Sequence, residues 1–157
     1  MRPASVVAAG LLCFAGSAPA FELVTPDEYL ADQVARPAGA ETPAPAKPRT
    51  RSLKPLFPRV EVLAPDSVTE VKPPVRIELR FIGEPGTPVD PASFHVYYGF
   101  LGIDITERIR DAAQITPEGL VAEGAELPVG SHSLKLTLAD AKGRGSSTVV
   151  KFKVVAP

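Results

Sequence analysis

The chain is poor in the residues that most often build reactive sites. Its 157 residues include no tryptophan, two histidines and a single cysteine, Cys13. Cys13 lies in an apolar N-terminal stretch and follows Leu12, whereas a lipoprotein signal places a small residue directly before its cysteine. We expect Cys13 to be discarded with a leader. This excludes a disulfide framework, a thiolate nucleophile and a cysteine metal site from the mature chain.

A strong charge of either sign is also missing. The chain has 17 Lys and Arg against 18 Asp and Glu, which gives a formal net charge of −1. This balance is typical neither of a nucleic-acid-binding protein nor of one strongly attracted to membranes. We therefore expect no nucleic-acid partner.

The first 20 residues have the features of a secretory leader. Arg2 supplies a positive start, residues 6–16 are almost continuously apolar, and Ala18 and Ala20 flank Pro19 at a peptidase site. The apolar stretch is too short to span a bilayer of roughly 30 Å. We predict cleavage after Ala20, no stable membrane insertion afterwards, and a periplasmic or extracellular mature protein.

Residues 21–36 form a head that is predicted to be helical. Thr25 and Glu28 have the spacing of a capping box, with Pro26 at the first helical position. A helix of two or three turns is unstable alone in water, so it must dock or fray. It could pack on its own domain, or serve as a docking peptide for a partner. Such a peptide would use four large apolar side chains as anchors: Phe21, Leu23, Tyr29 and Leu30.

Residues 37–58 are predicted to be a disordered linker. Their six prolines, dispersed among alanines and polar residues, oppose regular structure and keep the chain extended. Basic residues follow at Lys47, Arg49, Arg51, Lys54 and Arg59, with no acid between Thr42 and Arg59. We interpret this run as a solvated spacer, and an electrostatic tether to an anionic surface is the alternative.

Residues 59–157 alternate apolar and polar side chains with a period of two. The clearest example is the run VRIELRF from Val75 to Phe81, where one face is apolar and the other charged. Similar short segments recur about every ten residues, separated by turns rich in proline and glycine. We predict an all-β antiparallel sandwich of about seven strands, because a single sheet would leave its apolar face in water. The polar stretch 104–110 is predicted to be a charged edge strand.

The run LPVGSHSLKLTLADAKG at residues 127–143, together with residues 72–81 and 89–94, resembles the bacterial immunoglobulin-like (Big-type) secreted or periplasmic domains. The likeness covers residues 58–157. It implies an immunoglobulin-like sandwich, and it implies little about function, since this superfamily includes adhesin stalks, spacers, sugar-binding modules and periplasmic copper carriers.

Neither histidine stands in a recognisable ligand pattern. His95 follows Phe94 on a predicted strand, and His132 occupies the position of a corner tyrosine whose polar tip bonds back to the chain. We interpret both as structural and predict no metal site or cofactor. A small-ligand site for a metal or a glycan is the alternative, and it would need His95, His132, Asp90 or Asp104 to converge.

We predict no enzymatic activity and no catalytic residues. Ser93, Ser131 and Ser133 lie near histidines in the sequence, but no Gly-x-Ser-x-Gly elbow is present. A sandwich of this length with no tryptophan offers little room for a cleft. What remains is a non-catalytic interaction or structural module, with a protein partner in the cell envelope.

Two places are candidates for its binding surface. One is the segment from Tyr97 to Ile103, where Tyr97, Tyr98, Phe100 and Leu101 gather around two glycines. An exposed aromatic loop of this kind is typical of interfaces, whereas the alternative is that these side chains complete the core. The other candidate is the head, through Tyr29 and Leu30.

Overall fold

A computed structural model describes residues 20–38, 58–65 and 70–157. The predicted leader and most of the predicted linker lie outside these ranges. The described elements run in the following order: β1 (Phe21–Glu22), α1 (Pro26–Ala35), β2 (Arg59–Ala64), β3 (Glu70–Val71), β4 (Val75–Ile82), β5 (Val89–Tyr98), β6 (Ile103–Asp104), α2 (Thr106–Ala112), β7 (Ala113–Thr116), β8 (Gly119–Glu126), β9 (Gly130–Asp140) and β10 (Gly145–Val154).

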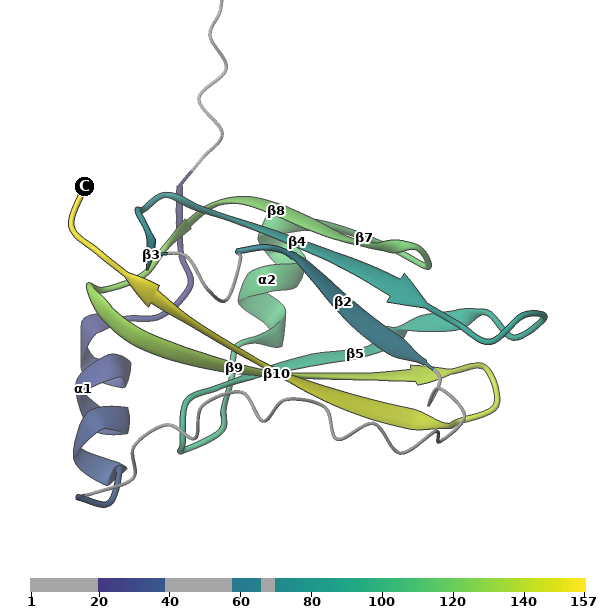
Figure 1. Cartoon of the computed structure of the whole chain (residues 1–157), viewed down its shortest axis with the longest axis horizontal. Helices are drawn as coiled ribbons and strands as arrows, with labels where there is room; N and C mark the ends of the chain where they lie inside the picture. The colour runs from purple at the N-terminus through teal and green to yellow at the C-terminus, as the bar shows by residue number, and fades with distance from the viewer. Residues whose placement is uncertain (1–19, 39–57, 66–69) are drawn as a thin grey trace, which may run out of the picture.

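The strands form two facing sheets, as Figure 1 shows. In the first sheet the order is β1-β8-β4-β2, with β7 also paired to β8, and in the second it is β3-β10-β9-β5-β6. Without the three two-residue strands, the neighbours are β2-β4-β8-β7 and β10-β9-β5. These are the ABED and GFC sheets of a constant-type immunoglobulin domain in chain order. The predicted all-β, immunoglobulin-like sandwich is confirmed.

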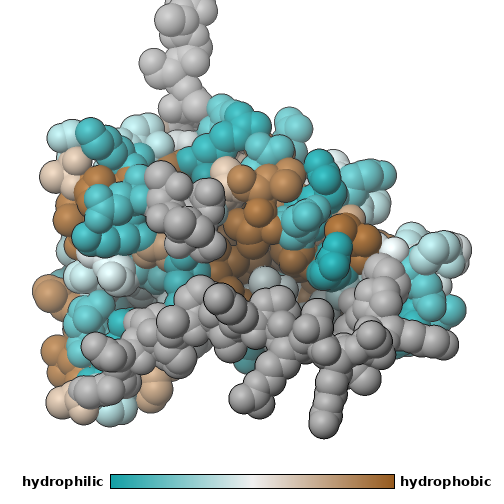
Figure 2. All heavy atoms as spheres, viewed as in Figure 1, coloured by the Kyte–Doolittle hydropathy of each residue, from teal (hydrophilic) through white to brown (hydrophobic). Residues whose placement is uncertain are grey.

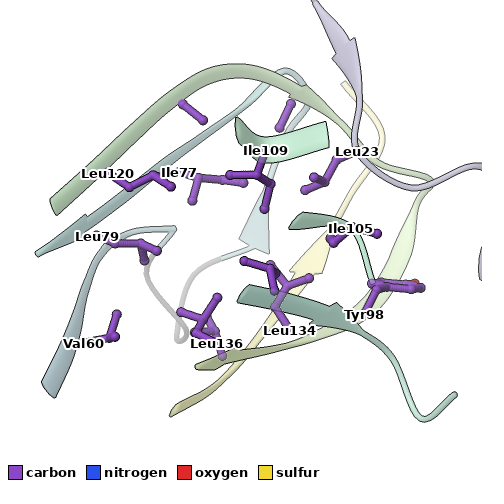
Figure 3. Close-up of a cluster of buried hydrophobic side chains, with 14 of the residues drawn as sticks. Leu23, Val60, Ile77, Leu79, Tyr98, Ile105, Ile109, Leu120, Leu134 and Leu136 are labelled. Atoms are coloured by element: carbon purple, nitrogen blue, oxygen red, sulfur yellow. The ribbon is translucent and has the colours of Figure 1, made fainter. Parts of the chain in front are cut away.

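The core follows from the alternation seen in the sequence. Along β4, residues at every second position are buried and their neighbours face solvent. Figure 3 shows side chains from both sheets meeting between them, with Ile77, Leu79 and Leu120 from one sheet and Leu134 and Leu136 from the other. Burial of this apolar face stabilises the domain without any disulfide.

The sharp turn between β9 and β10 is held by a buried carboxylate. Asp140 Oδ1 accepts the main-chain amides of Lys142 at 2.9 Å and Arg144 at 3.0 Å, and Gly143 takes a positive φ of 74°. A short acceptor side chain that satisfies amides two and four residues ahead fixes this turn and the register of both strands. It is one of the glycine-containing turns that the sequence predicts between the strands, and it lies where β9 ends and β10 begins.

The prediction of a strand over residues 104–110 was wrong, because Thr106–Ala112 is helix α2. Ile105 and Ile109 are both buried in the core, and four residues separate them. A spacing of four fits a strand and a helix alike, so the apolar pattern could not distinguish them. The intervening Glu107 is exposed, as the helical period requires. The helix carries the chain from the second sheet back to the first.

The head of the chain is an integral part of the sandwich. β1 pairs in parallel with β8, with Phe21 opposite Ala125, and the Leu23 amide continues the pairing by donating to the Glu126 carbonyl at 3.0 Å. Leu23 and Val24 then enter the core and are 0% and 1% exposed. The side chain of Leu23, considered above as an anchor for a partner, anchors the chain to its own domain instead.

We predict that Leu23→Ala lowers the free energy of unfolding by about 3 kcal/mol, because it removes buried methyl groups and leaves a cavity. Urea denaturation followed by circular dichroism measures this change. The matched control is Leu30→Ala in the same segment, where the side chain is largely exposed and the expected change is within about 0.5 kcal/mol. Equal losses for the two variants would contradict the placement of Leu23.

Candidate functional site

Helix α1 stands across one end of the sandwich, on the left in Figure 1. The predicted capping box begins it: the Thr25 hydroxyl accepts the Glu28 amide at 3.2 Å, and the Glu28 carboxylate accepts the Thr25 amide at 3.0 Å. The helix contacts two loops, residues 99–102 and residues 127–130. We refer to α1 and these two loops together as the α1 end.

A buried carboxylate connects α1 to the first loop. Asp32 is 0% exposed, and its Oδ1 accepts the main-chain amides of Phe100 and, at 3.2 Å, Leu101. Its Oδ2 accepts from the Arg36 guanidinium at 2.9 Å. The buried charge is thereby both paired and hydrogen-bonded, as a carboxylate removed from water must be. The loop is held in one conformation against the helix.

The approach of Asp32 requires glycine at position 99. Gly99 has a φ of 67°, and a Cβ added there would lie 2.2 Å from Asp32 Oδ1. A larger residue would meet both a strained backbone and a direct clash with the carboxylate. Of the two glycines that marked this segment in the sequence, Gly99 therefore has a local cause in the packing of α1, whereas Gly102 has open space around it and a positive φ of 65°.

The second loop is held by an aromatic contact. The Tyr29 hydroxyl lies where a Cβ on Gly130 would stand, only 2.0 Å from that position, and the Tyr29 ring packs 5.3 Å from the ring of His132. His132 Nε2 lies 2.7 Å from the Pro128 carbonyl, which can only accept, so Nε2 donates. Nδ1 then accepts from the Tyr98 hydroxyl at 3.0 Å.

These bonds give His132 the role of a corner residue, as predicted, with its polar tip bonded back to the chain. Burial lowers the pKa of His132, and burial also raises the pKa of the Tyr98 phenol. Both groups are neutral near pH 7. Since both ring nitrogens of His132 are engaged inside the protein, this imidazole has no nitrogen left for a ligand.

An ion pair fixes the start of α1. The Arg108 guanidinium of α2 donates to both oxygens of Glu28 at 2.7 Å and to the Leu23 carbonyl at 3.1 Å. The hydrogen bonds from Arg108 lower the pKa of Glu28 from its ordinary value of 4.5 to about 2, although burial opposes this shift. A bidentate pair of this kind is stronger than an ordinary surface salt bridge.

The α1 end gathers most of the exposed apolar side chains of the described residues. Eight large apolar side chains in this part of the chain face solvent, and five of them lie here, between 50% and 86% exposed. These five are Leu30, Val34, Phe100, Leu101 and Val129. Figure 2 shows hydrophobic atoms along the side of the molecule where Figure 1 places α1.

The structure separates the predicted binding residues into two groups. Leu30, Phe100 and Leu101 are exposed at the α1 end, so the head and the 97–103 segment, which the sequence presented as alternatives, lie at the same end of the domain and are joined there through Asp32. Tyr29 is half-buried beneath them against the core. The other two lie elsewhere: Tyr98 is buried, and Tyr97 stacks on His95, at a ring distance of 6.3 Å, on the outer face of the second sheet.

Two exposed residues of the α1 end, Val34 and Val129, were not among the binding residues predicted from the sequence. Leu30 and Val34, four residues apart, lie on the outward face of the helix, whereas Tyr29 points inward against the core. Val129 lies in a predicted turn between Pro128 and Gly130, and a single apolar residue in a turn does not indicate a binding surface. Asp32 was missed as the organising residue, because a single carboxylate in a short helix carries no sequence signal for burial.

The residues of the small-ligand alternative do not assemble. His132 is used internally, and Asp90 accepts the amide of Ala92 within its own turn at 3.0 Å. Asp104 already accepts the Thr106 amide at 2.9 Å, and the His95 ring stacks on Tyr97. Over residues 20–38, 58–65 and 70–157, no three side chains of the metal-ligating types are grouped to hold an ion. In the same ranges no helix combines the length and apolarity needed to cross a membrane.

Comparison with known proteins adds little. No protein-family model matches the chain, and no curated protein matches it. Among solved structures, the chain is similar to CopC from Methylosinus trichosporium OB3b, with 21% identity and a TM-score of 0.39 over 62% of this chain and 95% of that one. The immunoglobulin-like assignment therefore rests on the strand order of the chain itself.

The Glu28–Arg108 pair predicts an acid-sensitive component of stability. Because folding depresses the pKa of Glu28, the pair contributes fully above about pH 4.5, and its contribution is lost as the pH falls from there to about 2. In Glu28→Gln this component is absent at every pH. We expect the stability gap between the native protein and the variant, measured by urea denaturation, to be wide at pH 6 and narrower at pH 3.

The control for this measurement is Asp27→Asn, which alters an exposed acid of the same helical turn. Its gap from the native protein is expected to be small and nearly constant between the two pH values. A Glu28→Gln gap of the same size at pH 6 and pH 3 would contradict the assigned ion pair.

Proposed function

We propose that this protein is a non-catalytic binding module of the cell envelope, and that it holds a protein partner at the α1 end. The observation that carries the proposal is the concentration of exposed apolar side chains there, five of the eight in the described part of the chain. Exposed apolar side chains that gather in one region of a domain are typical of interaction sites, whereas single residues scattered over the surface need no explanation.

The construction of this surface supports the same proposal. Phe100 and Leu101 project from a loop whose amides are held by Asp32, and Val129 projects from a loop packed on Tyr29. Side chains held in this way lose little conformational entropy on binding, and this lowers the cost of forming an interface. An aromatic side chain such as that of Phe100 contributes a large apolar area to an interface.

The envelope location is part of the proposal and is supported by the leader predicted over residues 1–20. A small-ligand binder is the second candidate. The observation that favours it is His95, whose buried Nδ1 has no hydrogen-bond partner among the described residues. Further ligands from other side chains would be needed to hold a metal ion tightly.

A photo-crosslinking amino acid introduced in place of Phe100, in cells that express the full chain, tests the proposal. We expect capture of a specific envelope protein. Val34→Ser should then weaken capture roughly 5- to 30-fold, since it removes about 1–2 kcal/mol of apolar burial. Val149→Ser is the matched control, because Val149 is also an exposed valine but lies on β10 outside the α1 end.

If neither Val34→Ser nor Val149→Ser reduces the yield of crosslinked partner, the α1 end is not the contact surface. Titration of the purified chain with Zn²⁺ and Cu²⁺ separates the two candidates. Tight binding abolished by His95→Ala, together with no captured protein, would favour the small-ligand function instead.

A further inference from the structure

A recess of about 580 Å³ lies on the flank of the sandwich, where α2 meets the first sheet. Because β4 occupies one edge of β8, both β1 and β7 must pair along the other edge. β7 pairs with β8 up to Ala122, and β1 pairs with it from Ala125, so the two strands leave a gap between them. Side chains of β1, α2, β7 and β8 line the recess at this gap (Figure 1).

The recess combines apolar surface with unpaired carboxylates. Phe21 is half-buried against the core, and Val121, which is 38% exposed, projects outward because the adjacent Ala122 is buried. Glu22 and Asp111 are exposed beside them, and neither carboxylate forms an ion pair or a hydrogen bond within the part of the chain that the structure describes. This combination suits a ligand that has both an aliphatic stem and a positive charge.

The cation in the lining does not neutralise these acids. Arg108 donates to both oxygens of Glu28 at 2.7 Å, and these hydrogen bonds are the main cause of its raised pKa. Glu22 raises the pKa of Arg108 further, by charge alone. One guanidinium therefore stands against two carboxylates, and Asp111 is left without a cationic partner in the described residues.

The third acid of the lining, Glu123, is in a similar position. Arg76 Nη1 lies 2.6 Å from Glu123, but Arg76 Nη2 also lies 2.9 Å from Glu78, so again two carboxylates share one guanidinium. All three side chains are at least 32% exposed, and water screens such pairs. The recess thus keeps a negative charge after its own ion pairs are counted.

We propose that this recess binds a basic segment of a protein, in which a lysine or arginine lays its aliphatic stem on Val121 and directs its charged group to Glu22 and Asp111. Long basic side chains commonly cover apolar surface in this way while their charged ends stay beside acids or water. The recess shares no residue with the α1 end, so the proposal goes beyond the proposed function and does not depend on it.

The remaining polar group of the lining favours a peptide over a simple polyamine. Gln114 of β7 lies opposite Val121 in the register, and its exposed side chain forms no hydrogen bond among the described residues. Its amide can both donate to a carbonyl and accept from an N–H group. A peptide main chain presents both of these groups, whereas a polyamine presents donors alone.

The test is a titration of the ¹⁵N-labelled mature chain with hexalysine, followed by amide chemical shifts. We expect the largest shifts at the residues of the recess, including Asp111, Gln114 and Val121. The double variant Glu22→Gln with Asp111→Asn should weaken binding by about tenfold or more, because it removes the two carboxylates that face the ligand.

The matched control is Asp27→Asn with Glu118→Gln, which removes the same charge from two exposed acids outside the recess. Its affinity for hexalysine should fall by less than about twofold, since salt screens distant exposed charges. Equal losses for the two double variants would overturn the proposal, because hexalysine would then respond to net charge and not to a site.

The apolar contact needs a separate variant. Val121→Ser should weaken hexalysine binding severalfold, because the lysine stem loses part of its apolar support. Val149→Ser, on β10, is its control and should have no effect. Identical affinities for Val121→Ser and Val149→Ser would overturn the placement of the ligand on Val121. Binding of spermidine as tight as that of hexalysine would overturn the peptide in favour of a polyamine.

The basic run of the chain itself is the remaining competitor for the recess. Joint replacement of Lys47, Arg49, Arg51 and Lys54 by glutamine should leave the affinity for hexalysine unchanged. Tighter binding by this variant would overturn the proposal, because the run would then be the natural occupant of the recess and the added peptide would have been competing with it.

Discussion

The Asp32 carboxylate is the interaction on which the α1 end depends. It is fully removed from water, yet it accepts two main-chain amides of the loop between β5 and β6 and pairs with Arg36 one turn further along its helix. A carboxylate in such a place is tolerated only when its hydrogen-bonding capacity is satisfied, because an unpaired buried charge costs several kcal/mol. The helix and the loop therefore hold each other in place.

This arrangement makes a short helix useful. Ten residues would not remain helical alone in water, but α1 is preceded by Leu23 and Val24 in the core, begun by a capping box and tied by Arg108. Its inner face is thus committed to the domain, and its outer face is left to solvent. Leu30 and Val34 lie on this outer face.

The sequence was informative wherever a local rule decided the structure. Alternation from Val75 to Phe81 predicted a half-buried strand, the Thr25–Glu28 spacing predicted a capped helix, and both are present. Local patterns failed where two periods coincide, as at Ile105 and Ile109, which fit a strand and a helix equally. Local patterns also could not show that the head and the 97–103 segment lie at the same end of the domain.

The packing of the head against the 97–103 segment depends on tertiary contacts that no sequence pattern indicates. Nothing near Asp32 in the chain indicates that it meets amides 68 and 69 residues away. In the same way, only the register of β5 and β9 places Tyr98 and His132 where their side chains bond to each other. Sequence reasoning therefore reached the fold and some members of the surface, but not its organisation.

The most direct test of this account is native-state hydrogen exchange at the Phe100 and Leu101 amides, compared between the native chain and Asp32→Ala. Loss of the acceptor should speed exchange of these two amides by about 10- to 100-fold beyond any change in the β-strand core, because a lost hydrogen bond to a charged group costs about 1.5–3 kcal/mol. Asp27→Ala, on the exposed face of the same helix, should leave both rates unchanged. Equal protection of the two amides with and without the Asp32 carboxylate would contradict the claim that this residue organises the α1 end.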